Sequence, residues 1–190
     1  MNRIRWIDVS KAIGIIAIYL GHISTTEGVR CVPFVWTFHV PLFFLVSGCA
    51  EAVSKKQIGF VEFLLKKIKG LFIPWLIFAL LSTVIHVLIT NCSPTEVYKW
   101  ILEIGKGCIR NKFLAGSLWF LTCILVVQFV FFFIEKLKFK PLILAAATAI
   151  HIVARLFFNV NQPKLAFNVD TAAYYILFYA IGYVSFDMLN

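Results

Sequence analysis

The amino-acid sequence predicts an all-α fold: a polytopic bundle of about six transmembrane helices that forms one integral domain over residues 1–190. Of the 190 residues, 61% are hydrophobic and only 14% are charged, and the mean hydropathy is +0.90. A water-soluble domain rarely has this composition, because its solvated surface needs more polar side chains. Long apolar runs recur along the whole chain, and no polar block is large enough to form a separate soluble domain.

Six apolar runs are long enough to cross a hydrocarbon layer, which needs about 20 helical residues. The expected spans lie near residues 7–24, 32–50, 71–90, 117–134, 141–158 and 172–188, and the expected loops at 25–31, 51–70, 91–116 and 159–171. The first span is the weakest, because Asp8 and Lys11 lie in its opening turns. We do not expect a removable signal peptide, since Asp8 interrupts the charged lead and no small-residue cleavage site follows.

The basic residues favour one orientation in the membrane. With the N-terminus in the cytoplasm, the inner segments hold 11 of the 18 basic residues. These are Arg3, Arg5, Lys11, Lys55, Lys56, Lys66, Lys67, Lys69, Lys136, Lys138 and Lys140. The positive-inside rule therefore predicts that both termini are cytoplasmic. The net charge of +9 fits topology and anionic lipid head groups better than binding to nucleic acid.

The five cysteines show no metal-ligand spacing, and their odd number predicts no disulfide framework. Cys49 and Cys123 lie in predicted spans, where we interpret them as packing residues. Cys92 and Cys108 share a predicted outer loop. They either pair in an oxidising compartment or remain free thiols.

All four histidines, His22, His39, His86 and His151, fall in predicted spans. An ionisable group at membrane depth is costly, which makes each a candidate functional residue, although a hydrogen-bonded contact between helices is the more common role. His151 and Arg155, four residues apart, either line a path for a substrate or form hydrogen bonds to adjacent helices. We favour the second interpretation.

The first predicted span carries a polar stripe. Lys11 and His22 are eleven residues apart, which places them on nearly the same helical face and roughly 16 Å apart along the axis. Asp8 precedes Lys11 by three residues and can pair with its ammonium group. The stripe is either a cation below a proton-accepting imidazole or an interfacial salt bridge with a histidine that links helices.

A second cationic group, Lys66, Lys67 and Lys69, precedes the third predicted span. Its predicted depth is close to that of Lys11. These lysines are suited to the phosphates of a cytosolic cofactor, and a neutral His22 above them is suited to take a proton from an attacking hydroxyl. The positive-inside rule alone also explains lysines at this position.

Five stretches carry a family resemblance. They are "RWIDVSKAIGIIAIYLGH", "FHVPLFFLVSG", "KKIKGLFIPW", "SLWFLTCILVVQ" and "NVDTAAYYILFYAIGY". In this order they resemble landmarks of the acyltransferase family 3 membrane proteins, and in particular of the polysaccharide O-acetyltransferase branch that includes fucose 4-O-acetylase-like enzymes. The resemblance extends over essentially the whole chain. Members of this branch usually continue with further helices after "FYAIGY", so we expect the chain to correspond to the N-terminal part of a longer domain.

The resemblance implies transfer of an acetyl or similar acyl group from cytosolic acyl-CoA to a sugar hydroxyl of a cell-envelope polysaccharide or glycolipid. Acetyl-CoA is the implied donor, and no metal is implied. His22 matches the catalytic histidine, and Lys11 matches its basic partner, which is arginine in many members. Asp8 is expected to position Lys11, and Lys66, Lys67 and Lys69 to bind the cofactor near positions where many members have arginines.

His39 matches the second histidine of the branch. One interpretation is that Pro41 bends the second span so that His39 faces the cavity of His22 and orients the acceptor sugar. The other is that His39 is satisfied by a neighbouring carbonyl group.

The implied setting is a multi-pass protein of the bacterial plasma (inner) membrane. Its partners would be acyl-CoA, a cell-surface glycan or lipid-linked sugar, and the bilayer, with no nucleic acid. The alternatives are a transporter or flippase for a glycan or lipid-linked substrate and an inactive truncated remnant. The acidic residues Asp8, Glu51, Glu135 and Asp187 lie at the ends of predicted spans rather than at their centres, which disfavours a proton-coupled transporter.

Overall fold

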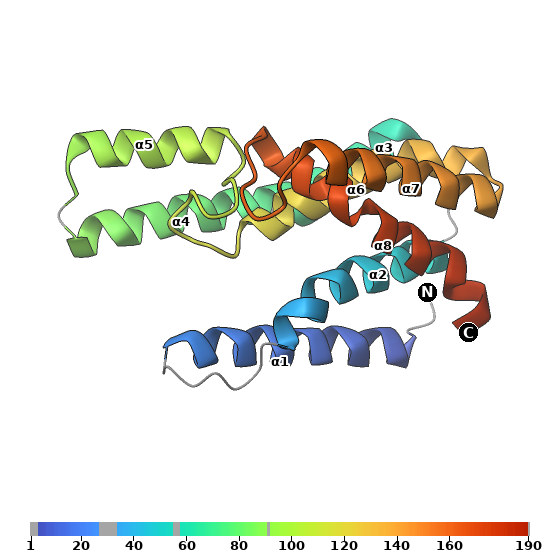
Figure 1. Cartoon of the computed structure of the whole chain (residues 1–190). Helices are drawn as coiled ribbons and strands as arrows, with labels where there is room; N and C mark the ends of the chain where they lie inside the picture. Colours follow the sequence, from blue (N-terminus) through green and yellow to red (C-terminus); the bar gives the residue numbers. More distant parts are fainter. Residues whose placement is uncertain (1–3, 27–33, 55–57, 91, 190) are drawn as a thin grey trace. The chain divides into compact units, whose positions relative to one another are not determined.

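The computed structural model describes residues 4–26, 34–54, 58–90 and 92–189, and within these ranges it contains helices and turns but no strand (Figure 1). The predicted all-α class is therefore confirmed. Five helical segments are long and apolar enough to cross a membrane. They are Thr37–Ser54, Phe60–Thr90, Trp119–Leu137, Lys140–Phe157 and Ala166–Met188.

The first predicted span forms helix α1 (Arg5–Thr26), which is long enough to cross a membrane but is not one of these five segments. The charged side chains of Asp8 and Lys11 lower its hydropathy, in keeping with its being the weakest of the six predicted spans. Helix α2 (Val35–Ser54) follows and contains Pro41 without interruption. Pro41 has no N–H to donate to the carbonyl group of Thr37, one turn earlier.

The predicted loop at 51–70 is wrong over most of its length. Helix α3 (Phe60–Lys67), the π-helical turn η1 (Ile68–Phe72) and helix α4 (Ile73–Thr90) follow one another without a break as a 31-residue segment. Gly70 lies inside the π-helical turn instead of ending a helix. The lysines of "FLLKKIKG" suggested a loop, but their long side chains are compatible with a helix at the membrane interface.

The predicted loop at 91–116 also contains a helix, α5 (Pro94–Gly105). Ser93 caps it: the Ser93 hydroxyl accepts from the Glu96 N–H at 3.3 Å, and a Glu96 carboxylate oxygen accepts from the Ser93 N–H at 2.9 Å. This reciprocal capping box, with proline at the first helical position, is a sequence signature of a helix start. It is visible in the letters "SPTE", so this helix was predictable.

The remaining elements agree with the predicted spans to within a few residues. They are α6 (Trp119–Ile134), the 3-10 turn η2 (Glu135–Leu137), α7 (Lys140–Phe157), the 3-10 turn η3 (Ala166–Asn168) and α8 (Val169–Leu189).

The chain divides into two compact units. The first comprises Met1–Lys56, Leu137–Thr148 and Tyr175–Asn190, and the second comprises Gln57–Lys136 and Ala149–Tyr174. The core of the second unit joins the side chains of Trp75 and Ala79 on α4, Ile104 on α5, and Phe113 in the following loop.

In the first unit, α1 packs against α2 through small residues. Gly14, Ala17 and Gly21 are buried on one face of α1, and a Cβ atom at Gly14 would lie only 2.8 Å from the Phe43 ring. Small residues at such a face allow two helices to approach closely.

Helix α2 also meets the second half of α8 in backbone-to-backbone contact. A Cβ atom at Gly48 would collide with the carbonyl oxygen of Tyr179, and one at Gly182 would collide with that of Leu45. The Cys49 thiol donates to the Gly182 carbonyl at 3.2 Å. Glycine is therefore required on both helices for this crossing.

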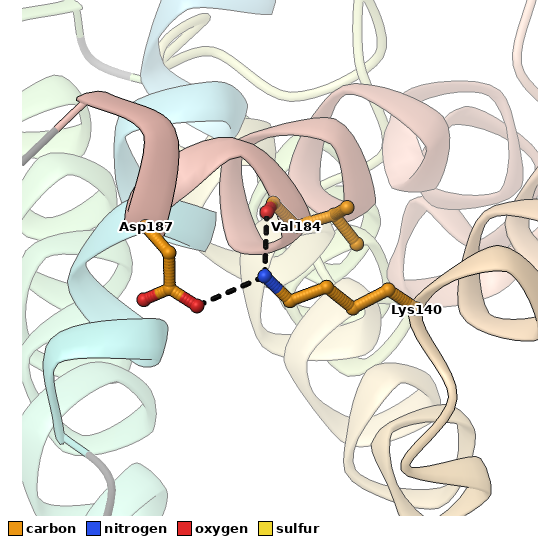
Figure 2. Close-up of polar contacts among 3 residues, drawn as sticks. All are labelled: Lys140, Val184 and Asp187. Atoms are coloured by element: carbon orange, nitrogen blue, oxygen red, sulfur yellow. Dashed lines mark hydrogen bonds and ion pairs between the residues drawn. The ribbon is translucent and has the colours of Figure 1, made fainter.

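An ion pair joins α7 and α8 in the same unit (Figure 2). The Lys140 ammonium donates to the Asp187 carboxylate at 2.9 Å and to the Val184 carbonyl at 3.2 Å. A cation is favourable near this end of α8, because the helix dipole places partial negative charge at the C-terminus.

Candidate functional site

The polar stripe of α1 lies beside the face that packs on α2. Lys11 is exposed and Asp8 is half-buried, whereas the packed face contains Ile7 and Gly14. His22 belongs to α1 by its backbone, and its side chain lies outside the described part of the structure. The predicted pairing of Lys11 with His22 on one helical face stays a prediction.

His39 lies in the first turns of α2 and is only 6% exposed. Its Nδ1 is 2.7 Å from the carbonyl oxygen of Val35, one turn earlier. Because a carbonyl oxygen only accepts, Nδ1 must carry the hydrogen, and the neutral ring then has its basic lone pair on Nε2. The neighbouring-carbonyl contact expected in one interpretation is present, and it also sets the tautomer that a proton acceptor needs.

The lysine cluster belongs to the second unit. Lys66 and Lys69 are exposed, and the ammonium group of the half-buried Lys67 lies 5.2 Å from the centre of the Phe63 ring. The Phe63 ring stacks on Phe132 of α6 with the ring centres 4.5 Å apart. The contact brings the start of the long α3–α4 segment to the C-terminal end of α6.

Lys136 lies at the same place. Its ammonium group is 4.7 Å from the centre of the Phe132 ring, so Lys67 and Lys136 each contact one ring of the stacked pair. In the sequence, Lys136 served only as a topological signal. No local pattern relates residues so far apart, and only the packing of α3 on α6 shows that Lys136 extends the predicted cationic cluster.

A buried polar hub holds the opposite end of α6. Asn168 is fully buried and has a left-handed φ of 56°, which asparagine tolerates better than most residues. Its side-chain oxygen accepts from the Arg110 N–H at 2.9 Å, and its amide donates to the Thr122 hydroxyl at 2.9 Å and to the Gly107 carbonyl at 3.3 Å. One side chain thus ties the loop after α5 to α6 and to the start of α8.

Asp170 performs a similar role two residues later. Its carboxylate is 4% exposed and accepts from the backbone N–H groups of Lys164 at 2.7 Å, Leu165 at 3.1 Å and Thr171 at 2.8 Å. These charge-assisted bonds hold the loop that precedes α8. Neither Asn168 nor Asp170 was selected from the sequence, although both stand in the noted stretch "NVDTAAYY".

An open surface cavity of about 450 Å³ lies at the C-terminal end of α7. It is lined by Arg155, Leu156, Phe157, Phe158, Asn159, Val160 and Tyr174. The nearby His151 Nδ1 donates to the Tyr174 carbonyl at 2.6 Å, which agrees with the favoured interpretation of His151 as a hydrogen-bonded contact to an adjacent helix.

His86 and the described cysteines lie outside the polar hub of Asn168 and Asp170. His86 is half-buried and packs edge-on against Trp100 with the ring centres 6.0 Å apart. The described cysteines, Cys49, Cys92, Cys108 and Cys123, are free thiols, so Cys92 and Cys108 do not pair. Burial, with a smaller contribution from the Glu103 carboxylate, raises the pKa of the Cys108 thiol to about 12.

Five membrane-length helices together with histidine and lysine side chains on them define a multi-pass α-helical membrane protein. Residues 4–189 match a family model described as an acyltransferase domain. Since the match covers almost the entire chain, the protein belongs to acyltransferase family 3 and is a membrane acyltransferase. None of the curated proteins and none of the solved structures matched the chain.

Proposed function

We propose that the protein is a membrane-bound O-acyltransferase that moves an acetyl or similar acyl group from cytosolic acyl-CoA to a sugar hydroxyl of a bacterial cell-envelope polysaccharide or glycolipid. The observation that carries this proposal is the family match over residues 4–189. The acceptor, the donor and the plasma-membrane location go beyond that match, and the resemblance of the individual motifs supports them.

His22 is the general base of the proposed reaction. Its imidazole takes the proton of the sugar hydroxyl as the oxygen attacks the thioester carbonyl of acyl-CoA. The C–S bond then breaks, the ester forms, and the proton passes to the departing CoA thiolate. Such a base typically contributes a factor of about 10² to 10⁴ in rate.

The lysines bind the phosphate groups of acyl-CoA. Lys11, positioned by Asp8, and the cluster Lys66, Lys67 and Lys69 supply the predicted cations. Lys136 joins them, because its ammonium group and that of Lys67 share the stacked Phe63–Phe132 pair. Lysine ammonium groups attract phosphates as point charges, without the bidentate geometry that arginine offers.

His39 orients the acceptor. Its hydrogen bond to the Val35 carbonyl fixes the ring on α2, and an imidazole held in this way is suited to position a sugar hydroxyl. Val35 lies on the same helix, so this bond fixes the orientation of the His39 ring relative to α2.

Radiolabelled acetyl-CoA supplied to inside-out membrane vesicles tests the proposed function. An acyltransferase labels the glycan fraction, whereas a transporter moves glycan without labelling it and an inactive remnant does neither. We expect His22→Ala to reduce labelling by about 10² or more, and His86→Ala, a matched membrane histidine, to keep it. Labelling by His22→Ala at the rate of the unaltered protein would remove His22 from the mechanism.

A further inference from the structure

The surface cavity of about 450 Å³ in the second unit is lined by none of the side chains assigned above to acyl transfer, and it is open rather than enclosed. Every residue that lines it comes from one continuous stretch at the end of α7 and the following loop, or from Tyr174 in the second turn of α8. The proposed base and the proposed lysines lie elsewhere in the chain.

The cavity combines one cation with aromatic walls. The Arg155 guanidinium carbon lies 5.8 Å from the centre of the Tyr174 ring, a cation–π contact. Arg155 is exposed, and within the described ranges no carboxylate forms an ion pair with it. Phe158 and Tyr174 provide apolar surface beside this guanidinium.

Part-buried hydrogen bonds tie the segments that line the cavity to neighbouring elements. The His151 ring bonds to the Tyr174 carbonyl, and the Arg110 guanidinium donates to the Val160 carbonyl at 3.3 Å. Arg110 thereby brings a second positive charge to the same loop. The buried Asp170 carboxylate is engaged by three backbone N–H groups, which fix the segment between the loop and α8.

We infer that this cavity binds a sugar that carries a carboxylate or a phosphate. Arg155 would hold the anionic oxygens through two parallel hydrogen bonds, and the aromatic walls would contact the apolar face of the ring. As a part of acyl transfer, this inference rests on the proposed function: it specifies an acidic sugar as the acceptor class.

Binding is tested on the purified full chain in detergent, with a disaccharide of glucuronic acid and N-acetylglucosamine as the probe. The control probe is the same disaccharide with its carboxylate reduced to an alcohol. We expect the acidic probe to bind at least about tenfold more tightly, and Arg155→Ala to remove that preference. Arg155→Lys should retain part of it, because the charge remains and the fork is lost. Lys164→Ala, which removes an exposed cation outside the cavity lining, should not change binding.

The second arm separates a sugar from a lipid head group, which offers the same anionic oxygens. Binding is repeated in nanodiscs of phosphatidylcholine and of phosphatidylglycerol. Equal affinity in both supports the sugar site, whereas loss of sugar binding in phosphatidylglycerol alone assigns the cavity to lipid and overturns the inference. Equal binding of the acidic and neutral probes, or unchanged binding by Arg155→Ala, also overturns it.

Acyl transfer is measured in parallel, so the two proposals fail separately. If binding depends on Arg155 but no transfer from acetyl-CoA occurs, the inferred subsite stands and the proposed function is contradicted. If the protein acylates a neutral glycan and Arg155→Ala does not change this activity, the proposed function stands and the inferred subsite is contradicted.

Discussion

The hydrogen bond of His39 predicts one tautomer. With Nδ1 donating to Val35, the neutral ring should be protonated on Nδ1, and two-bond ¹H–¹⁵N correlation spectra of ¹⁵N-histidine-labelled protein should show this form. His39→Ala should raise the KM for the acceptor several-fold and leave the KM for acyl-CoA unchanged, because the ring is proposed to contact only the sugar. A spectrum with the hydrogen on Nε2, or an effect confined to acyl-CoA, would contradict the proposed role.

Cys108 should be chemically silent in the folded protein. Its thiol is 1% exposed and its pKa is raised to about 12, so almost no thiolate is present at pH 9. In a Cys31→Ser background, maleimide at pH 7.5 should label the half-buried Cys92 and not Cys108, as read by mass spectrometry of peptides. The raised pKa also means that the contribution of Cys108 to stability is complete below the ordinary thiol pKa and is lost as the pH rises towards 12. Labelling of both thiols at equal rates in the folded protein would show that Cys108, in the loop after α5, is accessible to solvent.

Single side chains also show where sequence reasoning ends. His39, Lys66, Lys67 and Lys69 were selected because an ionisable residue near an apolar run is costly and therefore informative. Asn168 is fully buried, but its role depends on partners 46 to 61 residues away in the chain, as in its bonds to Thr122 and Gly107. A sequence pattern reports local spacing only, so such a hub is visible only after the fold is known.

The α2–α8 crossing depends on glycine on both helices. Gly182→Ala would force a Cβ atom into the Leu45 carbonyl, and overpacking of this kind costs about 1–3 kcal/mol. We expect a lower thermal unfolding midpoint in detergent, measured by intrinsic fluorescence. Gly105→Ala is the matched control, because a Cβ atom there would have no neighbour within 4 Å. Equal midpoints for both variants would show that these helices do not touch at Gly182.

Helices were predictable wherever apolar length alone determines them, as for α6, α7 and α8. They were missed where the deciding feature is short and polar: the lysine-rich start of the long α3–α4 segment and the capping box of α5. Both errors have one physical cause. A charged residue was read as a sign of solvent, although a glutamate in the first turn stabilises a helix through its cap and dipole, and long lysine side chains are compatible with a helix at the membrane interface.

The distribution of charge over the whole chain leads to a final prediction, because the same lysines serve topology and proposed catalysis. If Lys66, Lys69 and Lys136 only orient the protein, their replacement by alanine should affect every acyl donor equally. If they bind phosphates, the triple variant should lose efficiency with acetyl-CoA and keep it with acetyl-pantetheine, which lacks the phosphates. The effect should also shrink as the salt concentration rises, because the cations contacting the donor are exposed.

The measurement is kcat/KM for both donors in vesicles, and Lys112→Ala, an exposed lysine remote in sequence from the cluster, is the control for net charge. Membrane-impermeant maleimide on Cys92 reports whether the triple variant keeps its orientation, since inversion of the chain would change labelling without changing donor preference. A parallel loss for acetyl-CoA and acetyl-pantetheine with unchanged labelling would remove the lysines from donor binding. A loss of kcat/KM for acetyl-CoA alone would show that these lysines recognise phosphate in addition to orienting the protein in the membrane.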